Sequence, residues 1–292
     1  MSEEAGQTAA PGVSSARKTP RSNVSFSDLI PRALWGVVLT VLALGTAFSD
    51  GISFLLFWWA AAIAIHWEWQ RLVGGVRQIE RLIAGVAVIT AANLFVATGH
   101  LSWCILTLAV GTLATAALGG RRSRGIVGAG VLYAGSLPIA LTLLRASAPF
   151  GLEAILWLFA VVWGTDVMAY FGGRIIGGPK LWPRLSPSKT WSGFLVGVGT
   201  GALAGLAVAS GSGAHGPLVA LGIAAGAIAQ GGDLFESSLK RRFGVKDTSH
   251  IIPGHGGVMD RLDGFLAAAV FAACFGVIRF GIHSPAAGLL QW

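Results

Sequence analysis

Nine apolar segments of similar length dominate this chain of 292 residues. An α-helix needs roughly 20 residues to cross about 30 Å of hydrocarbon, and each segment approaches that length. The segments cover residues 32–48, 52–67, 82–98, 101–119, 125–144, 152–171, 192–210, 217–233 and 264–282. Only 12% of the residues are charged, about half the share of a soluble globular domain. The sequence therefore predicts an all-α, polytopic integral membrane helix bundle with about nine transmembrane helices.

The chain divides into three regions by composition. Residues 1–27 are rich in Ser, Ala, Pro, Gly and Thr, with interspersed basic residues, which predicts a disordered basic tail and not a signal peptide. Residues 28–150 contain five apolar segments and little else. Residues 151–292 contain the other four, together with two polar loops, 172–191 and 234–263, which are expected to carry the catalytic residues.

The positive charges predict how the bundle is oriented. If the N-terminus is cytoplasmic and the chain crosses nine times, 19 of the 21 Lys and Arg residues fall on the cytoplasmic side. Arg145 and Arg279 lie near outer ends. The long loops then face the cytoplasm. The formal net charge of +8 needs no nucleic-acid partner, because topology and anionic substrates explain it. The two cysteines lie inside apolar segments and indicate neither a disulfide framework nor a zinc site. Short loops favour a bacterial inner membrane.

Acidic and basic residues gather in the last cytoplasmic stretch, residues 233–263. It contains four aspartates, one glutamate, five Lys or Arg residues and a Gly-His-Gly-Gly turn. Carboxylate oxygens suit Mg²⁺, and Lys and Arg neutralise phosphate charge. Glycines allow the backbone to approach phosphates closely. This combination predicts chemistry on a nucleoside triphosphate.

The same stretch resembles the signature of the phosphatidate cytidylyltransferase family. From Ser237 to Asp263 it reads S-x-x-K-R-x4-K-D, a short spacer, P-G-H-G-G and then D-R-x-D. Two upstream blocks also resemble family elements: Thr165-Asp166-x3-Tyr170-Phe171-Gly172-Gly173-Arg174 and Ser186-Pro187-Ser188-Lys189-Thr190. Ser192 stands where the family often has Glu or Gln. The resemblance covers roughly the C-terminal half of the chain.

The resemblance implies transfer of CMP from CTP to phosphatidic acid, giving CDP-diacylglycerol and pyrophosphate. Both reactants are anionic, so catalysis would consist mostly of positioning and charge neutralisation. We assign Mg²⁺ to Asp233 and Asp260, and catalytic roles to Asp233, Asp247, Asp260, Asp263 and Lys246. We assign substrate binding to Asp166, Ser186, Lys189, Thr190, Ser237, Lys240, Arg241, His255, Gly256, Gly257 and Arg261. A second cation such as K⁺ is a family-level expectation, and a homodimer is left open.

Several of these residues also have an ordinary structural explanation, whereas Asp166 does not. Asp260 and Asp263 could be first-turn carboxylates favoured by a helix dipole. Lys240–Arg242 could serve only membrane topology. Glu236 and Lys240 are spaced i,i+4, as in a helix-stabilising ion pair. Asp166 lies in an apolar segment, where ionisable side chains are costly and usually functional.

Three other functions compete with this prediction. A transporter would show charged or broken helices at midplane and an internal repeat. The sequence has only Asp166 and Glu153 near helix ends, and the loop motif is not repeated. CTP-dependent lipid kinases and cytidylyltransferases of archaeal lipids are closer alternatives, because they use similar bundles. A CDP-alcohol phosphotransferase is excluded by the lack of a D-G-x2-A-R element, and the sequence contains no Walker A motif.

Overall fold

The fold is a bundle of long helices, seen in a computed structural model that describes residues 26–49, 51–209, 215–252 and 256–292. Within those ranges the helices are α1 (Phe26–Ser49), α2 (Ile52–Val73), α3 (Gln78–Ala97), α4 (Leu101–Ala117), α5 (Arg124–Arg145), α6 (Gly151–Ile175), α7 (Trp191–Val208), α8 (His215–Arg242), α9 (Met259–Phe280) and the short α10 (Pro285–Leu290). The predicted tail lies outside the described residues apart from its last two, which begin α1.

The helices confirm an all-α polytopic membrane fold. Among the described residues, seven helices are long and apolar enough to cross a membrane: α2, α3, α5, α6, α7, α8 and α9. Residues Leu34–Ser49 of α1 and all of α4 are shorter apolar helices. Each predicted apolar segment corresponds to one of these helices. The number of crossings and the cytoplasmic N-terminus remain predictions.

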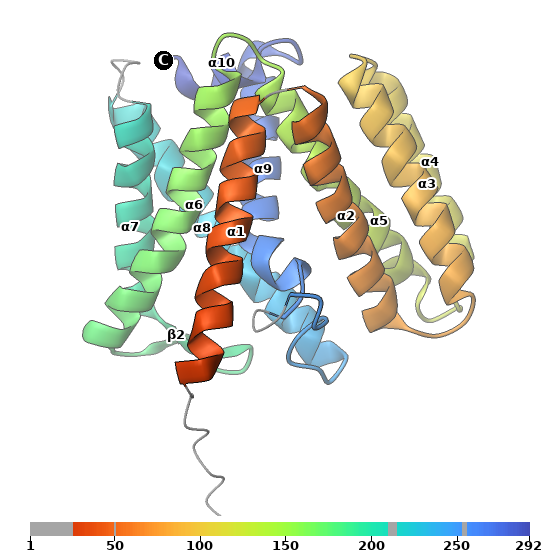
Figure 1. The fold of residues 1–292 in the computed structure, drawn as a ribbon, viewed down its shortest axis with the longest axis horizontal. Coiled ribbons are helices and arrows are strands. Elements are labelled where there is room, and N and C mark those ends of the chain that lie inside the picture. Colours follow the sequence, from red (N-terminus) through yellow and green to blue (C-terminus); the bar gives the residue numbers. More distant parts are fainter. Residues whose placement is uncertain (1–25, 50, 210–214, 253–255) are drawn as a thin grey trace, which may run out of the picture.

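The two ends of the bundle differ in chemistry. Figure 1 shows the start of α1, the end of α6 and strand β2 (Ser186–Thr190) at one end, which we call the hairpin end, and α10 at the other. The two predicted outer arginines lie at the α10 end. Arg145 donates from Nε to the carbonyl oxygen of Ala47 at 3.0 Å, and Arg279 donates from Nη1 to that of Gly288 at 2.7 Å. There they satisfy carbonyl groups at helix ends.

Both predicted polar loops are shorter than expected, because the neighbouring helices extend into them. Helix α8 continues to Arg242 and α9 begins at Met259, so the predicted loop 234–263 is reduced to residues 243–258. The hydropathy of this part is low because it contains Glu236 and Lys240, which line a cavity, and the exposed Arg241 and Arg242. Glu236 and Leu239, three residues apart, are nevertheless both buried, as expected for one face of a helix. The loop 172–191 contains an antiparallel hairpin of β1 (Lys180–Trp182) and β2, paired Lys180 to Thr190.

Aromatic side chains connect the N-terminal helices to the C-terminal half. Trp58 of α2 is buried and stacks on Phe265 of α9, with ring centroids 5.2 Å apart. Phe265 also stacks on Phe159 of α6 at 5.1 Å. Such pairs contribute about 0.5–1.5 kcal/mol beyond the area they bury. The core therefore fixes α2 against the helices that carry the polar cavity.

Helices α6 and α7 approach closely because α7 presents glycines to α6. A Cβ atom added to Gly201 would overlap Oγ1 of Thr165 and lie 2.6 Å from the carbonyl oxygen of Val161. Small residues allow transmembrane backbones to pack at short distance. The contact holds Thr165, and with it the next residue Asp166, against α7.

We expect Gly201→Val to destabilise the bundle, because the added isopropyl group would force α6 and α7 apart. Overpacking of this kind costs about 1–3 kcal/mol, or more where backbone must move. Gly199→Val is the matched control, since a Cβ on Gly199 meets no described atom within 4 Å. Thermal unfolding in detergent, followed by tryptophan fluorescence, should show a lower Tm for Gly201→Val only. Equal Tm values for the two variants would contradict this packing argument.

Candidate active site

A cavity of about 720 Å³ opens at the hairpin end, between the end of α6, the hairpin, the start of α7, the end of α8 and the start of α9. Its charged lining consists of Asp166, Asp233, Glu236, Asp260, Asp263, Arg174, Lys189, Lys240 and Arg261. Five carboxylates and four cations thus share one concave surface. All three sequence blocks that resemble the family contribute to it, although they are far apart in the chain.

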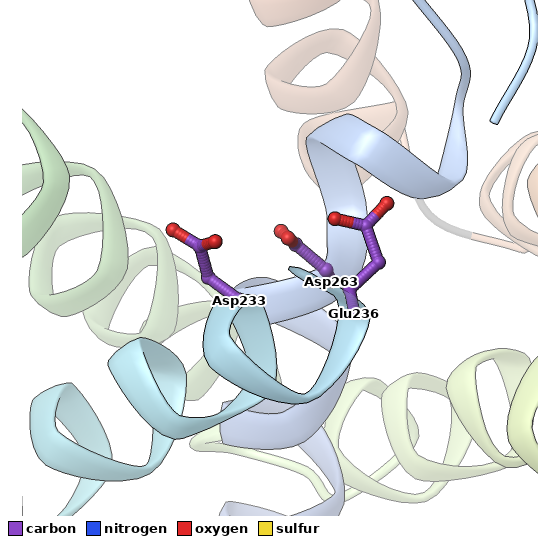
Figure 2. A group of neighbouring side chains, drawn as sticks. All are labelled: Asp233, Glu236 and Asp263. Carbon is purple, nitrogen blue, oxygen red and sulfur yellow. The ribbon is translucent and has the colours of Figure 1, made fainter. Parts of the chain in front are cut away.

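Three carboxylates converge in this cavity. Asp233 and Glu236 are spaced i,i+3 on α8, so they share one face of the helix, and Asp263 comes from α9. Each offers an oxygen within 4.8 Å of the others, and Figure 2 shows their carboxylate groups directed toward the same space. Gly232 permits this approach, since a Cβ there would lie 2.6 Å from the carbonyl oxygen of Asp263.

The three carboxylates, which we call the carboxylate cluster, have the donors that a hard divalent cation requires. Glu236 is only 1% exposed, and its Oε1 atom has no hydrogen-bond partner among the described residues. A buried acceptor without a donor costs free energy. A cation shared with Asp233 and Asp263 would remove that cost, so the residues fit Mg²⁺.

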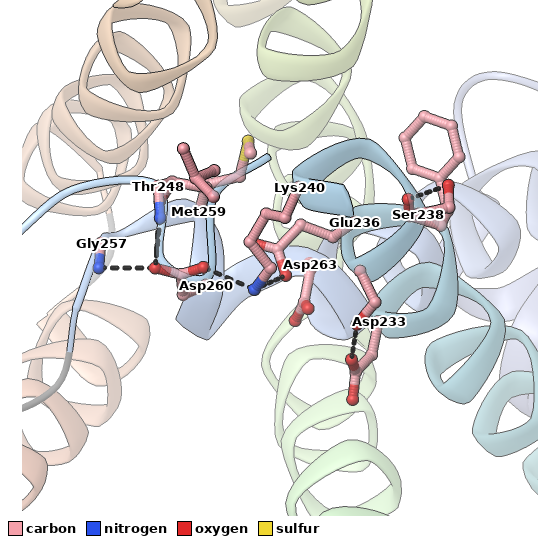
Figure 3. Close-up of polar contacts among 12 residues, drawn as sticks. Asp233, Glu236, Ser238, Lys240, Thr248, Gly257, Met259, Asp260 and Asp263 are labelled. Atoms are coloured by element: carbon pink, nitrogen blue, oxygen red, sulfur yellow. Dashed lines mark hydrogen bonds and ion pairs between the residues drawn. The ribbon is translucent and has the colours of Figure 1, made fainter. Parts of the chain in front are cut away.

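Lys240 links the carboxylate cluster to Asp260. Its Nζ atom lies 2.8 Å from Oε2 of Glu236 and 2.7 Å from Oδ1 of Asp260 (Figure 3). Oδ2 of Asp260 accepts hydrogen bonds from the backbone N–H groups of Thr248, at 3.0 Å, and Gly257, at 2.8 Å. Both oxygens of Asp260 thus have protein partners. The assignment of Mg²⁺ to Asp233 and Asp260 stays a prediction, but Glu236 and Asp263 are the carboxylates grouped with Asp233.

A second lysine, Lys189, contacts the carboxylate cluster at Asp233. Lys189 contacts Oδ2 of Asp233 at 2.6 Å and donates to Oε1 of Gln230 at 2.9 Å. The amide nitrogen of Gln230 donates to Oδ1 of Asp166 at 3.1 Å. Lys189 reaches this position because the next residue, Thr190, caps α7 by accepting from the N–H of Gly193 at 3.1 Å. The hairpin thereby holds a cation against the carboxylate cluster.

Eight of the predicted site residues line the cavity. They are Asp166, Lys189, Thr190, Asp233, Lys240, Asp260, Arg261 and Asp263. Ser237 lies behind this surface, and its hydroxyl donates to Oδ1 of Asp233 at 3.4 Å. Ser186 begins β2, on the hairpin but outside the lining. The end of α6, the hairpin, the end of α8 and the start of α9 therefore bring half of the predicted residues together in the cavity lining.

The remaining predicted residues lie in or beside the loop between α8 and α9. Arg241, Lys246 and Asp247 are exposed and outside the cavity lining. Gly256 has φ +85°, a conformation that favours glycine. Gly257 directs its N–H to Asp260 and not into the cavity. His255 lies outside the described residues.

The site also contains residues that the sequence analysis did not assign to it. Gln230 and Glu236 line the cavity, and the signal for both was their spacing of three residues on either side of Asp233 within one helix. Arg174 and Tyr170 line it as well; they belong to the first upstream block, which resembles the family. Arg174 donates from Nη1 to the Tyr170 hydroxyl at 2.7 Å.

Comparison with known proteins agrees with this geometry. The model of the cytidylyltransferase family matches residues 30–278. A phosphatidate cytidylyltransferase of Brucella abortus is 41% identical over 259 residues, which cover 87% of this chain and 95% of the relative. One from Pseudomonas aeruginosa is 36% identical over 271 residues, covering 86% and 98%. One from Staphylococcus epidermidis is 44% identical over 119 residues, covering 40% and 46%. The predicted resemblance is confirmed: this chain belongs to the cytidylyltransferase family, which includes these bacterial relatives.

Proposed function

We propose that this membrane protein transfers CMP from CTP to phosphatidic acid, releasing pyrophosphate and forming CDP-diacylglycerol. The carboxylate cluster facing Lys189 and Lys240 in one cavity is the observation that carries this proposal. A triphosphate and a phosphate monoester together bring several negative charges, which need both a divalent cation and basic side chains. The names of the relatives supply the substrate class.

The reaction follows from two bond changes. An oxygen of the phosphatidate phosphate forms a bond to the α-phosphorus of CTP, and the bond from that phosphorus to the bridging oxygen of pyrophosphate breaks. The attacking oxygen is already ionised, so no side chain has to remove a proton. The protein mainly has to hold the two anionic groups in line and neutralise their charge.

Asp233, Glu236 and Asp263 would hold Mg²⁺, which supplies charge neutralisation on the triphosphate when bound. Lys189 contacts Asp233 and Lys240 contacts Glu236, so each can exchange a carboxylate contact for a phosphate oxygen. K⁺ as a second cation remains part of the proposal. We place the cavity on the cytoplasmic side of a bacterial inner membrane, where CTP is available.

The lipid would approach the cavity through its α6 side. Tyr170 is 58% exposed and lies beside Phe171, which is also exposed. Arg174 is held beside Tyr170 by their hydrogen bond. A guanidinium next to exposed aromatic rings suits a lipid phosphate at the membrane interface, since rings of this kind favour the headgroup region and Arg binds phosphate.

We expect the purified protein in detergent to convert phosphatidic acid and CTP into CDP-diacylglycerol and pyrophosphate in equal amounts. CTP labelled at the α-phosphorus should transfer its label to lipid, and CTP labelled at the γ-phosphorus should not. A CTP-dependent lipid kinase would give the reverse labelling with diacylglycerol as acceptor. Label entering lipid only from the γ-phosphorus would therefore overturn the proposal in favour of a kinase.

A further inference from the structure

Glu68 is a buried carboxylate at the hairpin end that lies outside the cavity lining. It belongs to the last part of α2, in the N-terminal half of the chain, and is 0% exposed. Its neighbours fix this part of the helix: Trp69 donates from Nε1 to the carbonyl of Ile126 at 2.7 Å, and Gln70 from Nε2 to that of Val127 at 3.1 Å. The carboxylate is therefore presented from a rigid element.

Within the described residues, the hydrogen-bond partners of Glu68 all belong to the stretch that connects α8 to α9. Oε1 accepts from the Ser249 hydroxyl at 2.5 Å and from the N–H of Val258 at 2.8 Å. Oε2 accepts from the N–H of Met259 at 2.7 Å, and the Thr248 hydroxyl, whose one hydrogen Glu68 shares with Asp260, lies 3.3 Å from it. Glu68 thus joins the two ends of residues 248–259 and satisfies N–H groups at the start of α9, where a negative charge is favoured.

The contacts of Glu68 leave no room for a side chain at residue 257, which is a glycine. A Cβ atom at this position would overlap the Thr248 hydroxyl oxygen and lie 2.6 Å from Oε1 of Glu68. Its φ is not in the left-handed region, so backbone conformation does not demand glycine there. The second glycine of the Gly256-Gly257 pair is therefore required for space around the Glu68 carboxylate.

Thr248 connects Glu68 to the reaction site. Its hydroxyl lies 3.0 Å from Oδ2 of Asp260 as well as 3.3 Å from Glu68, and its N–H donates to the same Asp260 oxygen. Asp260 in turn contacts Lys240, the cation beside Glu236. Displacement of Thr248 would move two of the donors that orient Asp260.

We propose that Glu68 is a positioning residue, which clamps residues 248–249 and 258–259 onto α2 so that Asp260 and Lys240 are held for CMP transfer. The proposal rests on the proposed function, because its effect is measured in that reaction. Glu68 lies outside the cavity lining, so it would act through Thr248 and Asp260. Loss of a group that orients a catalytic one typically lowers activity or metal affinity about 10- to 100-fold.

The test compares Glu68→Gln with Glu80→Gln, an exposed glutamate at the same end of the bundle that pairs with Arg77 at 3.7 Å. Glu68→Gln keeps the side-chain shape but replaces one acceptor oxygen with an NH₂ group. That group would face the N–H and hydroxyl donors from which Glu68 accepts hydrogen bonds. We expect kcat to fall about 10- to 100-fold, with the KM for phosphatidic acid changed less than twofold. Amide hydrogen exchange should accelerate in peptides spanning Val258 and Met259, and not in peptides from α6 or α7. Glu80→Gln should match wild type in every measurement.

Two further variants keep the test decisive if Glu68→Gln does not fold. Ser249→Ala removes one donor and should lower kcat several-fold with faster exchange at Val258. Glu68→Asp keeps the charge and should recover part of the kcat lost in Glu68→Gln. Normal kcat and normal exchange in the Glu68 and Ser249 variants would overturn the positioning role. A wild-type protein without CMP transfer would overturn the proposed function, whereas unchanged exchange in Glu68→Gln would overturn the clamp alone.

Discussion

Asp263→Asn should lower the rate of CMP transfer about 10³-fold. Asn has the shape of Asp without its charge, and a bound metal contributes several kcal/mol of charge stabilisation, with each 1.36 kcal/mol equivalent to a factor of ten. Asp263 is the member of the carboxylate cluster that comes from α9, so its loss would leave only α8 to hold the metal. The measurement is kcat as a function of Mg²⁺ concentration, with the half-saturating Mg²⁺ concentration rising in the variant.

Asp260→Asn separates the two assignments of the metal. If Asp233, Glu236 and Asp263 hold Mg²⁺, Asp260→Asn lowers kcat through its contact with Lys240 but leaves the half-saturating Mg²⁺ concentration near that of wild type. If Asp233 and Asp260 are the pair, as the sequence analysis predicts, the Mg²⁺ dependence shifts in Asp260→Asn and stays normal in Asp263→Asn. That second pattern would refute the carboxylate cluster as the metal site.

Hydropathy was sufficient to predict the helices but not where they end. Hydropathy measures how well a segment suits lipid. It therefore identified the apolar middle of each helix, and each predicted segment ended at the first polar turn. Helix α8 shows the consequence: the prediction ends at residue 233, yet the helix continues to Arg242. Asp233 therefore lies inside the helix and not at its end. That continuation places Glu236 and Lys240 one turn apart on the face that borders the cavity.

The motif blocks predicted which residues would come together, but not their pairing. Asp166, Lys189 and Asp233 were each expected in the site, and spacing along the chain contains no information about the contacts among three separate elements. Glu68 was missed for a related reason. It lies in α2, far from the motifs in sequence, and its partners are mainly backbone and hydroxyl groups that no side-chain pattern reveals.

Lys240→Met should destabilise the folded protein by about 3–5 kcal/mol, since it leaves two carboxylates in a largely buried position without their cation. The side chains of Lys240, Glu236 and Asp260 are 15%, 2% and 6% exposed. We expect a fall in Tm on the order of 10 °C. Arg242→Met, an exposed cation in the same last turn of α8, is the control and should change Tm little.

The size of that effect decides between two interpretations of Lys240. A simple i,i+4 pair with Glu236 on a helix surface would contribute only about 0.3–0.5 kcal/mol. A cation bridging α8 and α9 through Glu236 and Asp260 contributes much more to the free energy of unfolding, because its removal leaves two buried negative charges without a cation between them. Lys240→Met combined with Glu236→Gln should then be more stable than Lys240→Met alone, since only one uncompensated carboxylate remains. A small loss of stability in Lys240→Met, with no recovery in the double variant, would show that the i,i+4 pair is all that Lys240 provides.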